Sequence, residues 1–553
     1  MTATLRTDPG GFRIRWSDTT AQAYRAAGHW RDETLTAVAR RAVQADPGRV
    51  LLIEGDKRLT RGEAWGMASR LASFFIERGL KPGDVVSVQL PNWVEAAVIG
   101  LAARMAGLII NPIPPIYRES ELGYILKDCG AKMIFTPHVF RRHDYRAMVE
   151  GLRAELPALK DVVTVRGGEP GDLRYEDALA APEAADADLP SVDSSAVMMV
   201  MYTSGTTGRA KGVLHTHYTY DYRVRTLGAA CGLGADDVVF MPSPVTHITG
   251  AIWCIDMPWV WGSSSVLIDV WAAEEGIQCI ETNRCTVSGG ATPFLRQLLD
   301  TAEGRPEAIA SLRLFFCGGT TVSPDLIREA SEKHPHGLFF RAYGSTEVPS
   351  VTLGISGRAE TELGAETDGK IDPTNQVKIV DPETDAELPE GAEGEILARG
   401  PEQFAGYLST ADNDGAFDDE GYFRMGDLGR RVHGDYLVIT GRKKDIIIRS
   451  GENISPKEVE DLLSTHPAVT EVAIVAMPSA TTGEKGCAFI IPAQGQTIDL
   501  AEIRRFLDEA GLARQKFPEH VVLVDDLPRV PSGKVRKDVL RTRARELAEG
   551  APA

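Results

Sequence analysis

The ten residues from Thr203 to Gly212 have the composition of a loop that binds phosphate. They contain three glycines, four hydroxyl side chains and Lys211. Glycine lets the backbone approach an anion closely, hydroxyl groups donate to phosphate oxygens, and lysine supplies positive charge. The spacing is not that of a Walker A loop, because Gly205 and Gly208 are only three apart and Lys211 is followed by glycine. For this segment alone, a flexible surface loop is the alternative interpretation.

Five further polar or glycine-rich segments follow later in the chain. They are Tyr343-Gly344-Ser345-Thr346-Glu347, Gly394-Glu395-Ile396 with Arg399-Gly400 and Gly406-Tyr407, Tyr422-Phe423-Arg424-Met425-Gly426-Asp427-Leu428, Gly441-Arg442-Lys443-Lys444-Asp445, and Pro531-Ser532-Gly533-Lys534. Together with the phosphate loop, they resemble the ordered motifs of the acyl-adenylate-forming superfamily, which includes acyl-CoA synthetases, nonribosomal adenylation domains and luciferases. The resemblance extends over almost the whole chain.

The resemblance implies a reaction in two halves. A carboxylate attacks the α-phosphate of ATP to give acyl-AMP and pyrophosphate, and a thiol then displaces AMP. Negative charge builds on phosphate oxygens in the first half, so positioned cations matter most there. The implied small molecules are a carboxylic acid, ATP, Mg²⁺ and, as the thiol substrate, CoA.

The phosphate contacts are implied in two motifs. Ser204, Thr206, Thr207 and Lys211 would hold the β- and γ-phosphates. Thr346 would contact the α-phosphate, and Glu347 would bind Mg²⁺, which suits a hard carboxylate oxygen. The complete set of implied ATP- or AMP-binding residues is Thr203, Ser204, Gly205, Thr206, Thr207, Gly208, Lys211, Gly318, Gly319, Tyr343, Gly344, Asp427 and Arg442.

The nucleoside contacts are implied at five of these positions. Tyr343 would stack on the adenine, while Gly318 and Gly319 would leave space for the base and the acyl group. Asp427 would accept hydrogen bonds from both ribose hydroxyls, a role that suits a charged acceptor. Arg442 would contact the ribose and phosphate near the domain boundary.

The resemblance also implies the catalytic and hinge residues. Lys534 would bridge the carboxylate and the α-phosphate, which lowers the repulsion between two anions. His247, in Pro242-Ser243-Pro244-Val245-Thr246-His247, would lie beside the substrate carboxylate and gate the thiol channel. Lys444 would be the hinge about which a small domain turns between the two half-reactions. Gly451 would lie beside the pantetheine tunnel of CoA.

The acid is expected to bind in an apolar pocket, for which Trp253, Gly290 and Ala291 are the candidate residues. Small residues there would leave room for a bulky acyl group. Gly289–Phe294, Arg341–Ser350 and Tyr24–Trp30 resemble the cyclohexanecarboxylate-CoA ligase branch, so an alicyclic, polycyclic or aromatic acid is the leading hypothesis. A medium- or long-chain fatty acid is the second.

Two other interpretations of the motifs stay open. A stand-alone acyl-AMP ligase would hand the acyl group to a carrier protein instead of CoA. A relative without adenylation activity would bind nucleotide only, or perform thioester transfer only. It is expected to lack the phosphate loop, Glu347 or Lys534, all of which are present.

Alternating strand-like and helix-like segments predict an α/β fold. A strand at 85–90, a helix at 93–106, a strand at 108–111 and a helix at 119–128 are typical of parallel sheets. Residues 167–195 are predicted to form an exposed connection. Short strands between 365 and 440 predict a β-rich subdomain. Residues 1–442 are therefore predicted to form a large N-terminal adenylation domain of layered α/β subdomains, and 443–553 a small mobile α+β domain that carries Lys534.

Composition sets further bounds on the function. A chain of 553 residues is too long for one core. Its net charge of −18 argues against a general nucleic-acid or anionic-membrane binder. The seven scattered cysteines form no CxxC pair and are expected to be free thiols in a reducing cytoplasm. No secretory signal or membrane span is expected, and a symmetric homodimer is the default assembly.

Overall fold

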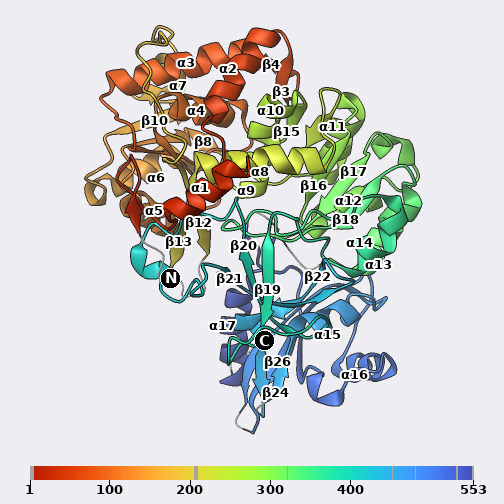
Figure 1. Cartoon of the computed structure of the whole chain (residues 1–553). Coiled ribbons are helices and arrows are strands. Elements are labelled where there is room, and N and C mark those ends of the chain that lie inside the picture. The colour runs from red at the N-terminus through yellow and green to blue at the C-terminus, as the bar shows by residue number, and fades with distance from the viewer. Residues whose placement is uncertain are drawn as a thin grey trace.

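The structure, a computed structural model, describes residues 5–204, 209–319, 322–450, 452–479, 481–530 and 533–550. The chain folds into two seven-stranded sheets covered by helices, a four-stranded antiparallel sheet and a C-terminal α+β domain. In Figure 1 the C-terminal domain (blue) lies below the four-stranded sheet, and the two larger sheets lie above it. The predicted fold class is confirmed.

The first seven-stranded sheet has the order β11-β10-β7-β5-β6-β12-β13. Its strands are parallel except for β13, which runs antiparallel to β12. The strands are β5 (Val85–Val88), β6 (Ile109–Pro112), β7 (Met133–Pro137), β10 (Asp161–Val165), β11 (Leu173–Arg174), β12 (Val197–Ser204) and β13 (Ala210–Thr216). The accompanying helices are α3 (Arg61–Glu77), α4 (Val94–Met105), α5 (Glu119–Asp128), α6 (Tyr145–Leu152) and α7 (Tyr175–Ala178).

The second seven-stranded sheet has the order β18-β17-β16-β14-β15-β3-β4, so its last two strands come from the beginning of the chain. The strands are β3 (Val50–Glu54), β4 (Lys57–Thr60), β14 (Val238–Phe240), β15 (Ser264–Leu267), β16 (Val287–Gly290), β17 (Leu314–Cys317) and β18 (Leu338–Arg341). The helices are α8 (His217–Ala230), α9 (Ile248–Gly250), α10 (Met257–Trp261), α11 (Ala273–Asn283), α12 (Thr292–Thr301), α13 (Pro324–Lys333) and α14 (Thr361–Glu366), with a π-helix over Ala251–Asp256.

One hydrophobic core joins the two large sheets. It contains Val86 from the first sheet, Leu52 from the second, and Tyr220 and Leu227 from α8. Arg104 of α4 lies inside this core and donates to both carboxylate oxygens of Asp256, which also accepts from the Tyr220 hydroxyl. Pairing offsets the cost of burying the two charges.

The four-stranded sheet and the C-terminal domain form the lower half of the molecule in Figure 1. The four-stranded sheet comprises β19 (Gln376–Val380), β20 (Gly394–Arg399), β21 (Phe423–Val432) and β22 (Tyr436–Arg442). The C-terminal domain comprises β23 (Ile447–Arg449), β24 (Glu452–Ile454), β25 (Val469–Ser479), β26 (Gly483–Pro492), β27 (His520–Leu523), α15 (Pro456–Leu463), α16 (Leu500–Glu509) and α17 (Lys537–Ala548). At the N-terminus lie β1 (Arg6–Thr7), β2 (Arg13–Ile14), α1 (Asp18–Ala26) and α2 (Leu35–Ala45), and β8 (Val139–Phe140) pairs with β9 (His143–Asp144).

The expectation of an exposed connection over residues 167–195 is wrong in part. This segment contains β11 and α7, and the side chains of Tyr175 and Ala178 are buried. The surrounding glycine, proline and acidic residues favour turns, so the sequence gives no clear signal for these short elements.

Six of the seven cysteines are buried free thiols, and Cys279 is half-buried. Within the described ranges, no helix is long and apolar enough to cross a membrane.

Candidate active site

A cavity of about 730 Å³ lies where the large sheets, the four-stranded sheet and the C-terminal segment meet. Its wall includes residues from β12, β16, β17, β18 and β21, together with Val530 and Lys534 from the C-terminal segment. The cavity therefore brings together motifs that are more than 300 residues apart in the sequence.

Asp427 is held between Tyr343 and Arg442. The Tyr343 hydroxyl donates to Asp427 Oδ2 at 2.7 Å, and Arg442 Nε donates to Oδ1 at 2.7 Å. Asp427 and Arg442 are directly opposite each other in the antiparallel pair β21–β22, so the strand register fixes this contact. The carboxylate of Asp427 raises the pKa of Arg442. Three of the predicted nucleoside-binding residues thus form one hydrogen-bonded group around the buried carboxylate of Asp427.

Three small residues lie in the wall of the same cavity. Gly318, Gly319 and Gly344 line it. A Cβ atom at Gly318 would lie 2.6 Å from the Ala342 carbonyl oxygen, and one at Gly344 would lie 2.4 Å from that of Pro349. The backbone passes too close at both positions for a side chain.

The phosphate loop connects β12 to β13. Thr203 and Lys211 line the cavity, and Lys211 Nζ lies 3.6 Å from Asp412 Oδ1. Gly205, Thr206, Thr207 and Gly208 lie outside the described residues, as does the side chain of Ser204.

Thr346 and Glu347 follow β18 and also line the cavity. The Tyr407 hydroxyl donates to Glu347 Oε1 at 2.8 Å, and the Phe404 amide donates to the Glu347 carbonyl at 2.8 Å. Glu347 is 8% exposed, so its carboxylate is a largely buried, pre-oriented acceptor. Tyr407 belongs to the Gly-Tyr motif, but its contact with Glu347 could not be read from the sequence.

Lys534 and His247 meet in the cavity from different domains. Burial and the nearby charge of Arg442 lower the pKa of Lys534 to about 8. Burial and the charge of Lys534 lower the pKa of His247 to about 4. Gly533, directly before Lys534, lies close to the large domain, where a Cβ atom at Gly533 would lie 3.4 Å from the Ala291 Cβ. This placement puts Lys534 in the same cavity wall as Ala291.

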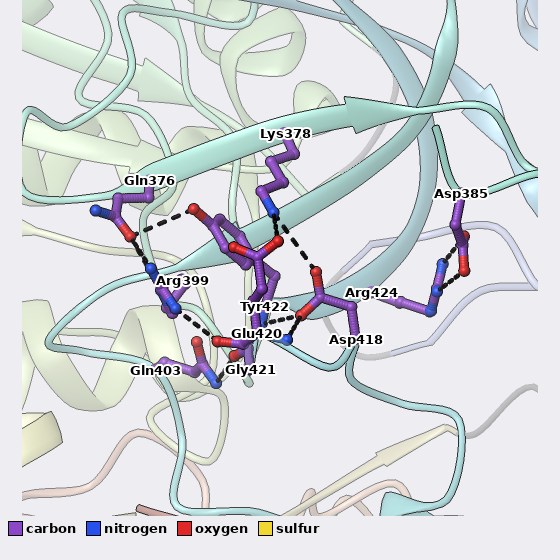
Figure 2. A network of polar contacts seen from close by, with 10 residues as sticks. All are labelled: Gln376, Lys378, Asp385, Arg399, Gln403, Asp418, Glu420, Gly421, Tyr422 and Arg424. Atoms are coloured by element: carbon purple, nitrogen blue, oxygen red, sulfur yellow. Dashed lines mark hydrogen bonds and ion pairs between the residues drawn. The ribbon is translucent and has the colours of Figure 1, made fainter. Parts of the chain in front are cut away.

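Polar contacts of the four-stranded sheet extend to the predicted hinge. Lys443 Nζ donates to Glu395 Oε2 at 3.0 Å, and Arg424 donates to the same oxygen at 3.2 Å. Figure 2 shows that Arg424 also pairs with Asp385. Lys444 follows directly and lines the cavity, and burial lowers its pKa. Its role as a hinge stays a prediction, and Gly451 lies outside the described residues.

Figure 2 also shows the outer part of this network. Lys378 donates to Glu420 at 2.6 Å, and Arg399 Nε donates to Gln376 at 3.0 Å. Both cations lie over the Tyr422 ring, at 4.2 and 4.4 Å from its centre. These contacts brace the start of β21, the strand that carries Asp427.

The other end of the cavity is apolar. Its apolar wall, which packs as part of the main hydrophobic core, consists of Met201, Leu227, Cys231, Ile248, Ile252, Trp253, Phe316, Phe340 and Leu353. Trp253 stacks on Phe316 with 4.8 Å between ring centres. Gly290 and Ala291 also line the cavity; at Gly290, φ is +147° and a Cβ atom would lie 2.8 Å from Phe294. All three predicted acyl-pocket residues are therefore in the wall.

The sequence matches the AMP-binding enzyme family over residues 39–408 and the AMP-binding enzyme C-terminal domain over residues 458–534. The chain therefore belongs to the AMP-binding enzyme family, and the resemblance to the acyl-adenylate-forming superfamily is confirmed.

Similar proteins cover nearly the whole chain. A medium-chain fatty-acid–CoA ligase of Escherichia coli (strain K12) is 34% identical over 538 residues, which are 95% of this chain and 94% of that protein. A salicyl-AMP ligase / salicyl-S-ArCP synthetase of Mycobacterium tuberculosis is 32% identical and covers 96% of this chain and 94% of its own. The crystal structure of ATP-bound MatB from Rhodopseudomonas palustris superposes with a TM-score of 0.83 at 30% identity, covering 93% of this chain and 100% of MatB.

Proposed function

We propose that this protein is an ATP-dependent acyl-CoA ligase that activates a carboxylic acid through an acyl-AMP intermediate. The observation that carries the proposal is that Lys534 and His247 line one cavity, together with an apolar wall and with Tyr343 and Arg442, the two residues that hold the Asp427 carboxylate. Activity on a fatty acid with CoA and on salicylate with a carrier protein is named among the similar proteins. A fatty-acid CoA ligase and a carrier-protein-loading ligase therefore stay as the alternatives.

In the first half-reaction, a carboxylate oxygen of the acid bonds to the α-phosphorus of ATP, and pyrophosphate leaves with the electrons of the broken P–O bond. We propose that the cation of Lys534, which lines the cavity, neutralises both reacting anions, and that Lys211 on β13 binds the leaving phosphates. Charge held in place before the reaction costs no reorganisation during it. Thr346 contributes to the same wall.

In the second half-reaction, the CoA sulfur bonds to the acyl carbon, and AMP leaves with the electrons of the C–O bond. The thiol proton goes to solvent. His247 is half-buried, and its lowered pKa of about 4 keeps it neutral at physiological pH, so it can border the acyl carbonyl without adding charge. We propose that the domain beginning at Lys443 turns at Lys444 to admit CoA, with Gly451 beside the tunnel.

The wall fits a Mg²⁺ ion that is bound mainly by the nucleotide. Among the described residues, no cluster of three or more His, Cys, Asp or Glu could hold a metal ion. Glu347 offers one largely buried carboxylate, already oriented by Tyr407. Mg²⁺ commonly binds through one or two carboxylates plus substrate phosphates, and it would neutralise phosphate charge there. Glu347 is the residue that we propose to hold it.

The apolar wall favours an acid whose body is uncharged. The charged side chains of the wall lie on β13, the 343–347 loop, the four-stranded sheet with its loops, and the C-terminal segment. Burying a second carboxylate against Trp253 and Phe316 would be costly because no cation lies in the apolar wall to pair with it. We propose alicyclic, polycyclic or aromatic acids as the lead, with fatty acids second.

Pyrophosphate release, with hydroxylamine to trap acyl-AMP, tests the proposal on a panel of cyclic, aromatic, fatty and dicarboxylic acids, each with and without CoA. We expect release with apolar monocarboxylic acids and a CoA thioester in the mass spectrum. Dicarboxylic acids of the same size should have kcat/KM values about 100-fold lower. Release without any thioester would favour the carrier-protein alternative. No release with any acid would contradict the proposed function.

The pH profile of adenylation should follow the ionisation of Lys534. Its pKa is lowered to about 8, and the protonated form is the one that neutralises anions. The kcat/KM for ATP, which reports the free enzyme, should therefore fall as pH rises through about 8. Pyrophosphate exchange without CoA measures this profile free of thiol ionisation.

The variant Lys534→Arg is the matched control, because arginine stays charged throughout this range. Its activity should be lower, but its profile should be flat above pH 8. An identical alkaline limb in both proteins would assign the ionisation to another group, such as Lys444, whose pKa is also lowered.

A further inference from the structure

His215 is a buried side chain that connects the two segments facing the phosphates. It lies on β13, four residues after Lys211, and is 0% exposed. Its Nε2 lies 2.7 Å from the carbonyl oxygen of Thr346, and its Nδ1 lies 3.1 Å from the Thr219 hydroxyl. The imidazole thus contacts the backbone of the 343–347 loop.

The partners define the tautomer. A carbonyl oxygen only accepts, so Nε2 must carry the proton and donate to Thr346. Burial lowers the pKa of His215 to about 4, so the ring is neutral and Nδ1 is free to accept from the Thr219 hydroxyl. Each ring nitrogen therefore has one directed hydrogen bond.

The strand beneath this contact is fixed along both edges. β13 pairs with β12 from Ala210 to Thr216, and its other edge exchanges hydrogen bonds with residues 405–408. Side chains two and four residues apart lie on one face of a strand, so Lys211 and His215 point to the same side. The distance between the Lys211 position and the Thr346 carbonyl is thereby set by a short, rigid piece of sheet.

Residues next to that edge also hold the neighbouring Glu347. The Phe404 amide and the Tyr407 hydroxyl donate to Glu347, while Val213 of β13 forms a bridge with Tyr407. β13 therefore holds Lys211 at a fixed distance from both Thr346 and Glu347. Without the bond from His215, the carbonyl of Thr346 would lose its buried donor, and the loop would be free to shift.

We propose that His215 is a positioning residue for adenylation: its Nε2–H holds the Thr346–Glu347 backbone in register with Lys211. The expected effect on the rate of adenylation rests on the proposed function, whereas the hydrogen bond itself does not. A displacement of about 1 Å in a phosphate-binding group can cost about 100-fold in rate.

Two polar substitutions of His215 distinguish the effect of losing the hydrogen bond to Thr346 from the effect of changing a buried side chain. In His215→Gln the amide nitrogen can occupy the place of Nε2, whereas in His215→Asn the shorter side chain reaches the place of Nδ1 and loses Thr346. We expect the kcat of ATP–pyrophosphate exchange to fall about 30- to 100-fold in His215→Asn and less than about 5-fold in His215→Gln. Conversion of synthetic acyl-AMP and CoA to thioester should change less than about 3-fold in both.

Hydrogen exchange of the ligand-free proteins supplies a readout that needs no substrate. The amides of residues 343–348 should exchange faster in His215→Asn than in His215→Gln and wild type. Equal losses in the two variants, equal losses in both half-reactions, or unchanged exchange at 343–348 would each overturn the inference. If wild type is inactive with every acid, the proposed function fails, and the exchange rates alone decide the role of His215.

Discussion

Lys534→Ala should slow adenylation about 100- to 1,000-fold and leave thioester formation from synthetic acyl-AMP within about 3-fold of wild type. Removing one preorganised group that stabilises charge in a transition state typically costs this much. Lys534 lines the cavity with Arg442 and His247, and desolvation there lowers its pKa to about 8, so its charge acts where solvent screens it less than in bulk water. The second half-reaction no longer joins two anions, so it should not need this cation. Pyrophosphate exchange and thioester formation measure the two halves separately.

Lys516→Ala is the matched control for this experiment. Lys516 lies in the same C-terminal domain and pairs with Glu458 at the surface. Its removal should change neither half-reaction by more than about 2-fold, because exposed ion pairs contribute little. A Lys534→Ala enzyme that loses both half-reactions equally, with a lower melting temperature, would indicate a folding defect instead of a role in adenylation.

Much of the fold could be predicted from local patterns. The helix at α4 and the strands on either side of it follow from periodicity and turns. The joining of β3 and β4 to the second sheet could not be predicted, because strands distant in sequence pair through tertiary contacts. α7 was hidden for another reason: it is only four residues long and its neighbours favour turns.

In the candidate site, too, local motifs could be predicted from the sequence, whereas the contacts between them could not. Motif order identifies Asp427, Lys534 and Glu347, but it carries no information on what holds them. The contact of Tyr343 with Asp427 and that of Tyr407 with Glu347 join residues 84 and 60 positions apart. His215 has no motif of its own in the sequence. The role that we propose for His215 rests on the burial of its ring and the position of the Thr346 carbonyl, and both depend on the folded chain.

Asp427→Asn should lower kcat/KM for ATP about 10- to 100-fold and reduce the preference for ATP over 2′-deoxy-ATP or 3′-deoxy-ATP. A hydrogen bond to a charged acceptor contributes about 1.5–3 kcal/mol, which corresponds to this range. The carboxylate is 5% exposed and already accepts from Tyr343 and Arg442, so it is oriented before ATP binds. An amide offers only one acceptor oxygen and leaves Arg442 without its countercharge. Competing the three nucleotides in pyrophosphate exchange measures the preference.

The variant Tyr343→Phe separates the ribose contact from the support of the carboxylate. It removes the donor to Asp427 Oδ2 but keeps the charge, the ring that we propose to stack on adenine, and the pair with Arg442. It should lower kcat/KM less than about 5-fold and keep the discrimination against deoxy-ATP, because the acceptor for the ribose hydroxyls remains. If Asp427→Asn discriminates as wild type does while its melting temperature falls, Asp427 serves the pairing of β21 with β22 through Arg442, and the ribose must be held by another group of the cavity.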